Sequence, residues 1–223
     1  MQSDIKTLGI VLKRTNYGEA DRILNLITPE GKISAIAKGV RRARSKLAGG
    51  VEMFSLSELN IHQGKSELGV VTSAKMLKYY NKLLADYSKM ELAATILKKV
   101  SLAAESSDSS DYFKLTDESL SGLNDGVNTK LVESWFLLNL VRAMGEEINL
   151  HRDINGEKLD AVRRYAWDSV EKSFVAREMG DYGANEIKML RLMLTTDLAV
   201  VARVNGYEPM SSRIWAVVQT YQV

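Results

Sequence analysis

The chain has 223 residues, of which 45% are hydrophobic and 26% charged, and a formal net charge of +2; these values are typical of a globular protein that buries a core. It contains no cysteine, which excludes disulfides, thiolate metal sites and a cysteine nucleophile. No signal-peptide pattern opens the sequence and no apolar stretch approaches the ~20 residues that span a bilayer, so we expect a cytoplasmic protein without a membrane segment.

The N-terminal third of the chain has the pattern of short β-strands separated by turn residues. Apolar or alternating runs predict strands at Leu8–Leu12, Arg22–Thr28, Lys32–Lys38, Phe54–Ile61 and Leu68–Ser73. Gly9 suggests a bulge or a sharp bend in the first of them. Turn residues occur at Asn16–Glu19, Pro29–Gly31 and Gln63–Ser66. Five short strands in about 70 residues fit a small closed barrel better than a βαβ sheet.

After Ala74 the apolar spacing becomes that of helices. Helices are predicted at residues 90–104, 111–123, 129–144, 187–194, 197–204 and 212–221. The helix at 129–144 is apolar on most sides, so we expect it at the centre of a bundle. Residues 165–175 are compatible with a hairpin or a helix. The expected class is α+β, with a barrel domain at residues 1–79 and a helical domain at residues 80–223.

The most unusual stretch runs from Lys38 to Gly50 and joins the third predicted strand to the fourth. Five of its first nine residues are basic, and no acidic residue occurs between Gly31 and Gly50. Residues 1–75 contain 12 basic and 7 acidic residues, a net charge of +5, against −3 for the remainder. Such asymmetry indicates an anionic partner, with nucleic acid as the first candidate. A solvated surface loop is the alternative interpretation.

Aromatic residues beside this loop are few. Tyr17, in the first turn, is a candidate for stacking on a base, and Phe54 is either a core residue or a second stacking platform. With so few aromatics, phosphate contacts should dominate, and binding should tolerate any sequence and weaken with salt.

No catalytic motif is recognisable in the sequence. Phosphate-binding and dinucleotide-binding glycine motifs are absent, and the histidines, His62 and His151, lie far apart. One acidic and histidine grouping occurs in a polar segment, at Glu146, Glu147, His151 and Asp153. Solvated charges explain it more simply than a metal or acid–base site. We therefore expect no enzyme activity, no metal, no cofactor and no small-molecule substrate.

Several short motifs, in this order, resemble the amino-terminal domain of the bacterial recombination mediator RecO over about residues 8–77. They are Gly9–Leu12, Tyr17–Asp21, Gly31–Ala35, Lys38–Arg42, Ser45–Leu47 and Phe54. Lys-Gly-x-Arg-Arg followed by Ser-x-Leu is the most specific of them. Near the other end, Ser212-Arg213 resembles the C-terminal Ser-Arg of that family.

The resemblance implies an OB-fold followed by a helical domain. It also implies binding of single- and double-stranded DNA, annealing of complementary strands, and cooperation with RecR in loading the RecA recombinase onto strands covered by single-strand DNA-binding protein, in the nucleoid-associated cytoplasm. Many members carry a four-cysteine zinc module between helical segments. Residues 150–180 stand in its place here, without cysteine.

Our hypothesis is a non-enzymatic DNA-binding mediator of repair. Phosphate contacts are assigned to Arg41, Arg42, Arg44 and Lys46, with Lys13, Arg14, Arg22 and Lys38 as supporting cations and Tyr17 beside them. The alternative is a protein-interaction adaptor whose basic loop binds acidic protein tails. Four helical-domain residues then supply an apolar groove, unless they belong to the core: Met189, Met193, Trp215 and Tyr221.

Overall fold

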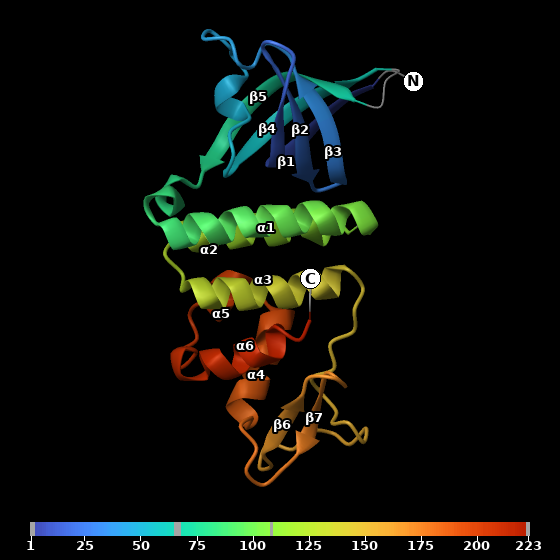
Figure 1. Cartoon of the computed structure of the whole chain (residues 1–223), viewed down its shortest axis with the longest axis vertical. Coiled ribbons are helices and arrows are strands. Elements are labelled where there is room, and N and C mark those ends of the chain that lie inside the picture. The colour runs from blue at the N-terminus through green and yellow to red at the C-terminus, as the bar shows by residue number, and fades with distance from the viewer. Residues whose placement is uncertain (1–2, 65–67, 108, 222–223) are drawn as a thin grey trace. The chain divides into compact units, whose positions relative to one another are not determined.

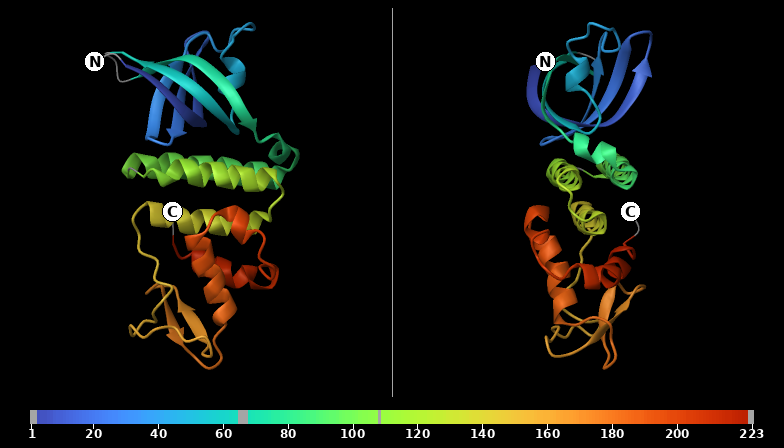
Figure 2. Two further views of the ribbon diagram at one scale, coloured as in Figure 1. Left: turned by 180° about the vertical axis from the view of Figure 1, so that it is seen from behind. Right: turned by 90° about the vertical axis from the view of Figure 1, so that its left-hand side faces the viewer.

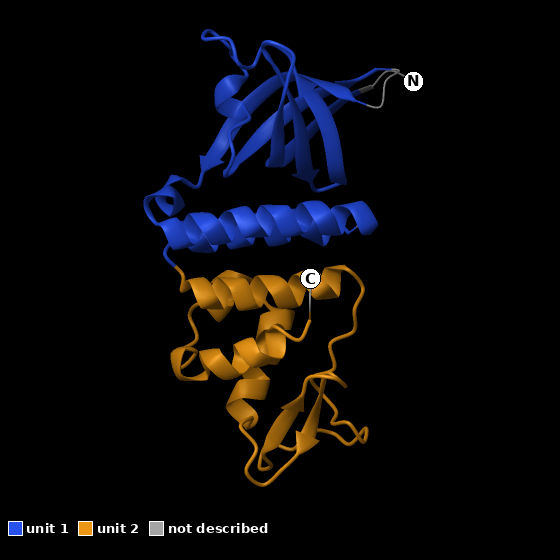
Figure 3. Cartoon of the chain, in the orientation of Figure 1, with its two compact units in different colours: residues 1–126 blue, residues 127–223 orange. Residues whose placement is uncertain are grey.

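The computed structural model of the chain describes residues 3–64, 68–107 and 109–221 (Figure 1). The turn expected at Gln63–Ser66 lies partly outside them. The chain divides into two compact units, residues 1–126 and residues 127–223 (Figure 3). The boundary expected after residue 79 stays a prediction. In the described residues, no helix is long and apolar enough to cross a membrane.

The first unit contains a closed barrel of five strands in the spatial order β1-β2-β3-β5-β4, which Figure 2 shows from two further sides. The strands are β1 (Ser3–Tyr17), β2 (Asp21–Thr28), β3 (Gly31–Ala37), β4 (Ser55–Gln63) and β5 (Gly69–Tyr79). This is the OB-fold arrangement of a small Greek-key barrel. The expected α+β class and five-stranded barrel are confirmed.

The strand β1 is longer than the apolar run that predicts it. Leu8–Leu12 is only the middle of a 15-residue strand. The first half pairs with β4 and the second half with β2, and the register shifts between Val11 and Lys13, where the strand changes partner. The irregularity therefore lies beyond Gly9, which instead allows a close approach: a Cβ there would be 2.7 Å from Cδ1 of Leu59.

One seam of the barrel is short. Among the described residues, the parallel strands β3 and β5 pair at two positions, Ala35–Gly69 and Ile36–Val70. Beyond this pairing, the short 3₁₀ helix η1 (Ala48–Gly50) contacts β5. The contact is so close that a Cβ on Gly50 would lie 2.4 Å from the carbonyl oxygen of Ala74. The connection between β3 and β4 thus covers the part of β5 that β3 leaves unpaired.

A pair of helices packs against the barrel within the first unit, and these elements lie side by side in Figure 2. After η2 (Asn81–Ala85) come α1 (Tyr87–Ser106) and α2 (Asp111–Asn124). The carboxylate of Asp86 caps α1 by accepting the N–H groups of Ser88 and Lys89 at 2.9 and 3.3 Å. The buried Tyr80, next to the end of β5, donates its hydroxyl to Asp117 of α2. Burial, this hydrogen bond and the Asp117 charge raise the pKa of Tyr80.

The second unit is built on α3 (Thr129–Ala143), which packs against α4 and α6 and is buried on most sides, as its sequence predicts. Trp135 donates its indole N–H to the carbonyl of Thr196 at 3.1 Å, and Asn139 donates to the carbonyl of Met193 at 2.9 Å. The other elements are α4 (Ala184–Thr195), the single-turn α5 (Leu198–Val201), the 3₁₀ helix η3 (Glu208–Met210) and α6 (Ser211–Val218).

Between α3 and α4 the chain forms a hairpin, which decides between the two expectations for this region. Its strands are β6 and β7, at Tyr165–Asp168 and Ser173–Ala176. Phe174 is fully buried, and its ring centroid lies 5.0 Å from Trp167, 5.5 Å from Tyr182 and 6.1 Å from Tyr165, edge to face. Tyr221 extends this cluster, 6.4 Å from Trp167. The hairpin therefore has an aromatic core of its own.

Replacing Gly50 by alanine is expected to destabilise the barrel by about 2 kcal/mol, because the new methyl group overlaps the Ala74 carbonyl and pushes η1 away from β5. Gly49→Ala is the matched control, since no atom lies within 4 Å of a Cβ at that position. Urea denaturation of both variants measures the difference. Equal unfolding midpoints for the two variants would contradict the close contact at Gly50.

Candidate nucleic-acid interface

A run of cations lies between β3 and β4, and we call residues 38–46 the basic loop. Its exposed basic side chains are Lys38, Arg41, Arg42, Arg44 and Lys46. Within the described part of the chain, none of these five takes part in an ion pair. Because like charges repel and no described carboxylate neutralises them, the basic loop is a region of positive potential.

The first end of the basic loop is tied to the turn between β1 and β2. The N–H of Gly39 donates to Oδ1 of Asp21 at 2.7 Å, and the N–H of Arg41 donates to the carbonyl of Ala20 at 2.9 Å. Gly39 has a φ of +63°, which glycine adopts without steric cost. Between these two bonds, Val40 is inserted into the barrel core with 2% of its surface exposed. The loop therefore leaves the barrel in a fixed direction.

The far end is anchored by apolar packing. Leu47 packs against the barrel core, and Val51, just after η1, is fully buried in it. Inside the loop, the N–H of Ser45 donates to the carbonyl of Arg42 at 3.0 Å, which makes a turn. Because Val40 and Leu47 both point inward, the cations between them project into solvent.

The aromatic candidate and one supporting cation lie at the same end of the barrel. Tyr17, the last residue of β1, has 56% of its surface exposed. The guanidinium of Arg41 donates to the carbonyl of Gly18 at 3.3 Å, next to Tyr17 in the chain. Arg22 lies across the turn and donates its Nε to the side chain of Asn16 at 3.3 Å. An aromatic ring and cations thus surround one turn, where bases and phosphates of a strand are able to bind together.

The structure does not bring two of the expected supporting cations to this turn. Arg14 forms an ion pair with Glu52 at 2.7 Å and has only 25% of its side chain exposed. Arg14 therefore neutralises the carboxylate of Glu52, which follows the basic loop in the chain. Lys13 lies near Glu105, at the C-terminal end of α1. There, hydrogen bonding and charge from Lys32 lower the pKa of Glu105, and Lys13 adds a smaller effect of the same sign.

Phe54 follows the basic loop in the chain and directly precedes β4. It is half-buried, and its φ of +56° places it in the left-handed region, which is uncommon for a non-glycine residue. Its carbonyl accepts the N–H of Tyr80 at 3.0 Å. Through this hydrogen bond, the residue before β4 is joined to the residue that follows β5.

The acidic grouping noted in the sequence has local structural roles. The carboxylate of Glu146 contacts Nζ of Lys172. Asp153 is 5% exposed and its Oδ1 accepts the N–H groups of Asn155 and Glu157 at 3.0 and 2.9 Å. Within the described residues, no cluster of three or more histidine, aspartate or glutamate side chains is arranged to hold a metal ion.

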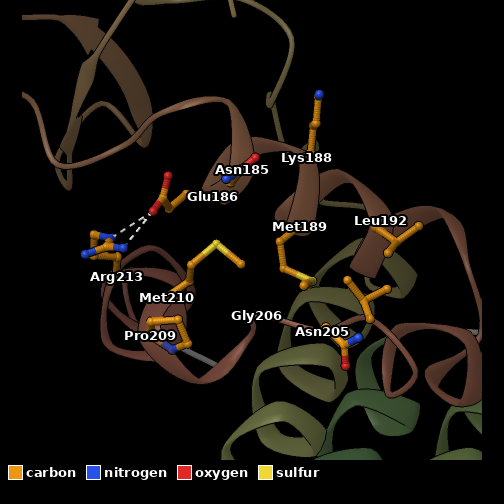
Figure 4. Close-up of a pocket in the computed structure, with 11 residues that line it drawn as sticks. Asn185, Glu186, Lys188, Met189, Leu192, Asn205, Gly206, Pro209, Met210 and Arg213 are labelled. Carbon is orange, nitrogen blue, oxygen red and sulfur yellow. Dashed lines mark hydrogen bonds and ion pairs between the residues drawn. The ribbon is translucent and has the colours of Figure 1, made fainter.

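A pocket of about 620 Å³ lies beside α4 in the second unit (Figure 4). Its apolar lining includes Met189 and Met210, and Figure 4 shows both methionines together with the Glu186–Arg213 pair. Of the residues expected to form an apolar groove, Met189 lines this pocket. Met193 and Tyr221 are buried in the core, with 0% and 3% exposed, and Trp215 does not line the pocket.

The ion pair at this pocket holds α6 against the first turn of α4. Arg213 donates to Oε1 of Glu186 through two nitrogens, at 2.7 and 3.1 Å, and the N–H of Gly183 donates to Oε2 at 3.0 Å. Burial raises the pKa of Glu186, but these hydrogen bonds and the Arg213 charge outweigh burial and lower the pKa below its ordinary value of 4.5. The Arg of the expected C-terminal Ser-Arg motif thus stabilises the second unit.

Comparison with known proteins agrees with this fold. The family model described as "Recombination protein O N terminal" matches residues 1–80, and "Recombination protein O C terminal" matches residues 85–222. The chain belongs to the RecO family. The DNA repair protein RecO of Dehalococcoides mccartyi is 33% identical over 168 residues, which cover 73% of this chain and 65% of that protein. The RecO of Heliobacterium modesticaldum is 30% identical over 203 residues, covering 84% and 72%.

The match with the Dehalococcoides protein therefore spans about two thirds of that relative's length. The two RecO family models divide the chain between residues 80 and 85, whereas the compact units divide after residue 126. Consequently α1 and α2 fall in the C-terminal family model although they pack with the barrel.

The four-cysteine zinc module mentioned with the RecO resemblance does not fit the residues of this chain. Structural zinc sites use four cysteine or histidine ligands, and no cysteine is present. In the corresponding segment, backbone N–H groups bind the carboxylate of Asp153, and buried rings surround Phe174. These contacts connect the parts of the segment to one another.

The cations of the basic loop are evident in the sequence, but the residues that position them are not. Asp21 and Glu52 are single acidic residues in polar segments, and nothing local marks them as anchors. Asp21 does fall within the Tyr17–Asp21 motif of the RecO resemblance, so that motif was the available signal.

Asp21→Ala is expected to loosen the basic loop, because it removes the acceptor for the Gly39 N–H. Trypsin cleaves after arginine and lysine, so cleavage within residues 38–46 should become several times faster. Asp21→Asn retains an acceptor oxygen and is the control, with cleavage close to wild type. Equal cleavage rates for the alanine variant and the wild type would show that this hydrogen bond does not hold the loop.

Glu186→Gln is expected to lower the free energy of unfolding by about 2 kcal/mol at neutral pH, because it removes the charge that pairs with Arg213. A lowered folded-state pKa stabilises the protein above the unfolded value near 4.5, and this stabilisation is lost as pH falls through the folded pKa. The difference from wild type should therefore vanish in acid. Glu171→Gln, an exposed control, should show no such pH dependence. A constant difference across the pH range would refute the assignment.

Proposed function

We propose that this chain acts without catalysis as a DNA-binding mediator of recombinational repair. It binds single- and double-stranded DNA and anneals complementary strands. With RecR it helps to load RecA onto strands covered by single-strand DNA-binding protein, at the nucleoid in the cytoplasm. Membership of the RecO family and the basic loop of the barrel support this proposal.

The observation that carries the proposal is the basic loop. Its cations are exposed, lack ion-pair partners among the described residues, and are held between buried anchors. A backbone held in this way loses little conformational entropy when a ligand binds. DNA is a suitable ligand because each neutralised phosphate releases condensed counterions, which favours binding to a cluster of cations.

The proposed roles follow the geometry. Arg41, Arg42, Arg44 and Lys46 contact phosphates, Lys38 and Arg22 support them, and Tyr17 stacks on a base. Arg14 acts through its ion pair with Glu52, and Lys13 adds long-range charge. If ~4–6 phosphates are neutralised, the log–log salt dependence of binding single strands should have a slope of roughly −3 to −4.

The combined variant R41A/R42A/R44A is expected to weaken binding of a single-stranded oligonucleotide by about 2–4 kcal/mol at low salt. The salt slope should become less steep, because fewer counterions are released. Fluorescence anisotropy across a salt series measures both quantities, and a strand-annealing assay should show a parallel loss. The fold should persist, since Val40 and Val51 are unchanged.

A charge-matched control, K98A/K130A/R203A, removes three exposed cations elsewhere in the chain. It should bind DNA nearly as wild type does. If the two triple variants weaken binding equally, the effect is one of net charge and the assignment to the basic loop is wrong.

A second candidate is the protein-interaction adaptor, which the apolar pocket beside α4 favours. In that case the basic loop binds acidic protein tails and DNA is not its ligand. Wild-type protein would then bind an acidic peptide and would not bind oligonucleotides. The variant R41A/R42A/R44A would no longer bind the peptide. Tight, salt-sensitive binding of DNA by wild-type protein excludes this candidate.

A further inference from the structure

A second group of guanidinium side chains lies in the second unit, at the open end of the β6–β7 hairpin. The last pair of the ladder is Tyr165 with Ala176, and the N–H of Arg177 then donates to the carbonyl of Arg164 at 3.0 Å. These two arginines are therefore opposite each other on the two adjacent segments of the hairpin. With Arg163 they line a hollow of about 450 Å³.

One wall of this hollow is fixed by backbone contacts. The Nε of Arg164 donates to the carbonyl of Gly180 at 2.8 Å. Gly180 itself lies so close to Tyr165 that a Cβ would be 2.3 Å from its backbone carbonyl. Tyr165 and Tyr182 exchange two backbone hydrogen bonds of 2.9 Å each. In the described residues, the other nitrogens of the Arg164 guanidinium have no protein acceptor.

The opposite wall is a turn that presents Arg163. The backbone N–H of Asp160 donates to the hydroxyl of Tyr165 at 2.7 Å, and the N–H of Val162 donates to the Asp160 carboxylate at 3.0 Å. Val162 lines the hollow with 88% of its surface exposed. Since Tyr165 belongs to the aromatic core, both walls are built on the same rigid support.

Among the residues that line the hollow, arginines outnumber carboxylates. One carboxylate, that of Glu178, lines it together with three arginines. Arg163 also lies 3.6 Å from Glu157, but with 58% and 68% of the two side chains exposed this pair contributes little. Arg177 acts at longer range on Asp168, whose pKa is lowered chiefly by two backbone N–H groups. Like charges on opposite strands are destabilising, so an anion in the hollow would relieve repulsion.

We propose that this hollow is a second binding site for a DNA backbone phosphate, built from elements other than the basic loop. Arginine offers parallel N–H donors whose spacing matches two oxygens of a phosphate, and three arginines line the hollow. Apart from Val162 and Ala176 the lining is charged, which suits a phosphodiester better than the apolar side chains of a peptide. The inference rests on the proposed function, because it assumes that DNA is the ligand.

The variant R163Q/R177Q tests the site, since it leaves the Arg164–Gly180 bond in place. It is expected to bind a single-stranded oligonucleotide roughly tenfold more weakly at low salt, with a log–log salt slope less steep by about 0.7, because one phosphate contact is lost. K130Q/R203Q is the charge-matched control and should retain both values. Glu178→Gln should bind several times more tightly, a gain that misfolding does not produce.

When R163Q/R177Q is combined with R41A/R42A/R44A, the two losses of DNA-binding free energy should add, because the sites are separate. If wild-type protein does not bind DNA, the proposed function fails. If wild-type protein binds and the basic-loop variant is defective, but R163Q/R177Q and Glu178→Gln behave as wild type, the second site is refuted and the proposed function stands. Loss of polyglutamate binding by R163Q/R177Q with unchanged DNA binding would also refute it, as the hollow would then serve an acidic peptide.

Discussion

The short pairing between β3 and β5 constrains the whole first unit. A five-stranded barrel that pairs these strands at two described positions leaves most of β5 without a partner on that side. The connection from β3 to β4 therefore has to run back over β5, where Gly50 allows η1 to touch the strand. Val40 and Val51 bury their side chains on the way. Closure of the barrel and placement of the basic loop are thus one structural requirement, since the cations between Val40 and Leu47 project into solvent.

In the second unit, the β6–β7 hairpin also depends on contacts beyond the pairing of its own strands. A short hairpin between α3 and α4 buries too little surface to be stable alone, and structural zinc supplies the missing free energy in many small modules. Here Phe174 and the rings around it supply apolar burial, while Asp153 satisfies backbone N–H groups that would otherwise be unpaired. The same aromatic core carries Tyr165, whose backbone and hydroxyl position both walls of the arginine hollow. Stability and presentation of charge therefore depend on one cluster.

Local patterns in the sequence predicted the features that local physics determines. In β3 and β4 one face is more buried than the other, so the alternation in their sequences predicted them, and the basic loop could be recognised because its charges are contiguous. The polar ends of β1 were missed because pairing with β4 at one end and with β2 at the other, and no apolar pattern, holds them in the ladder. Asp21, as an anchor, depends on a tertiary contact that no periodicity records. The arginines of the hollow were overlooked because acidic residues are interleaved with them, and only the hairpin turns Arg164 toward Arg177.

Two proposed phosphate sites on one protein affect the binding of a DNA strand differently from the binding of a single phosphate ion. For a strand that reaches both sites, the second contact is intramolecular, and an effective concentration replaces the bulk concentration. The gain depends on a strand long enough to reach both sites, so affinity should rise steeply with oligonucleotide length and then level off. A barrel whose only site was the basic loop would show no such step. The length dependence of DNA binding therefore reports on the site in the second unit, although the basic loop belongs to the first.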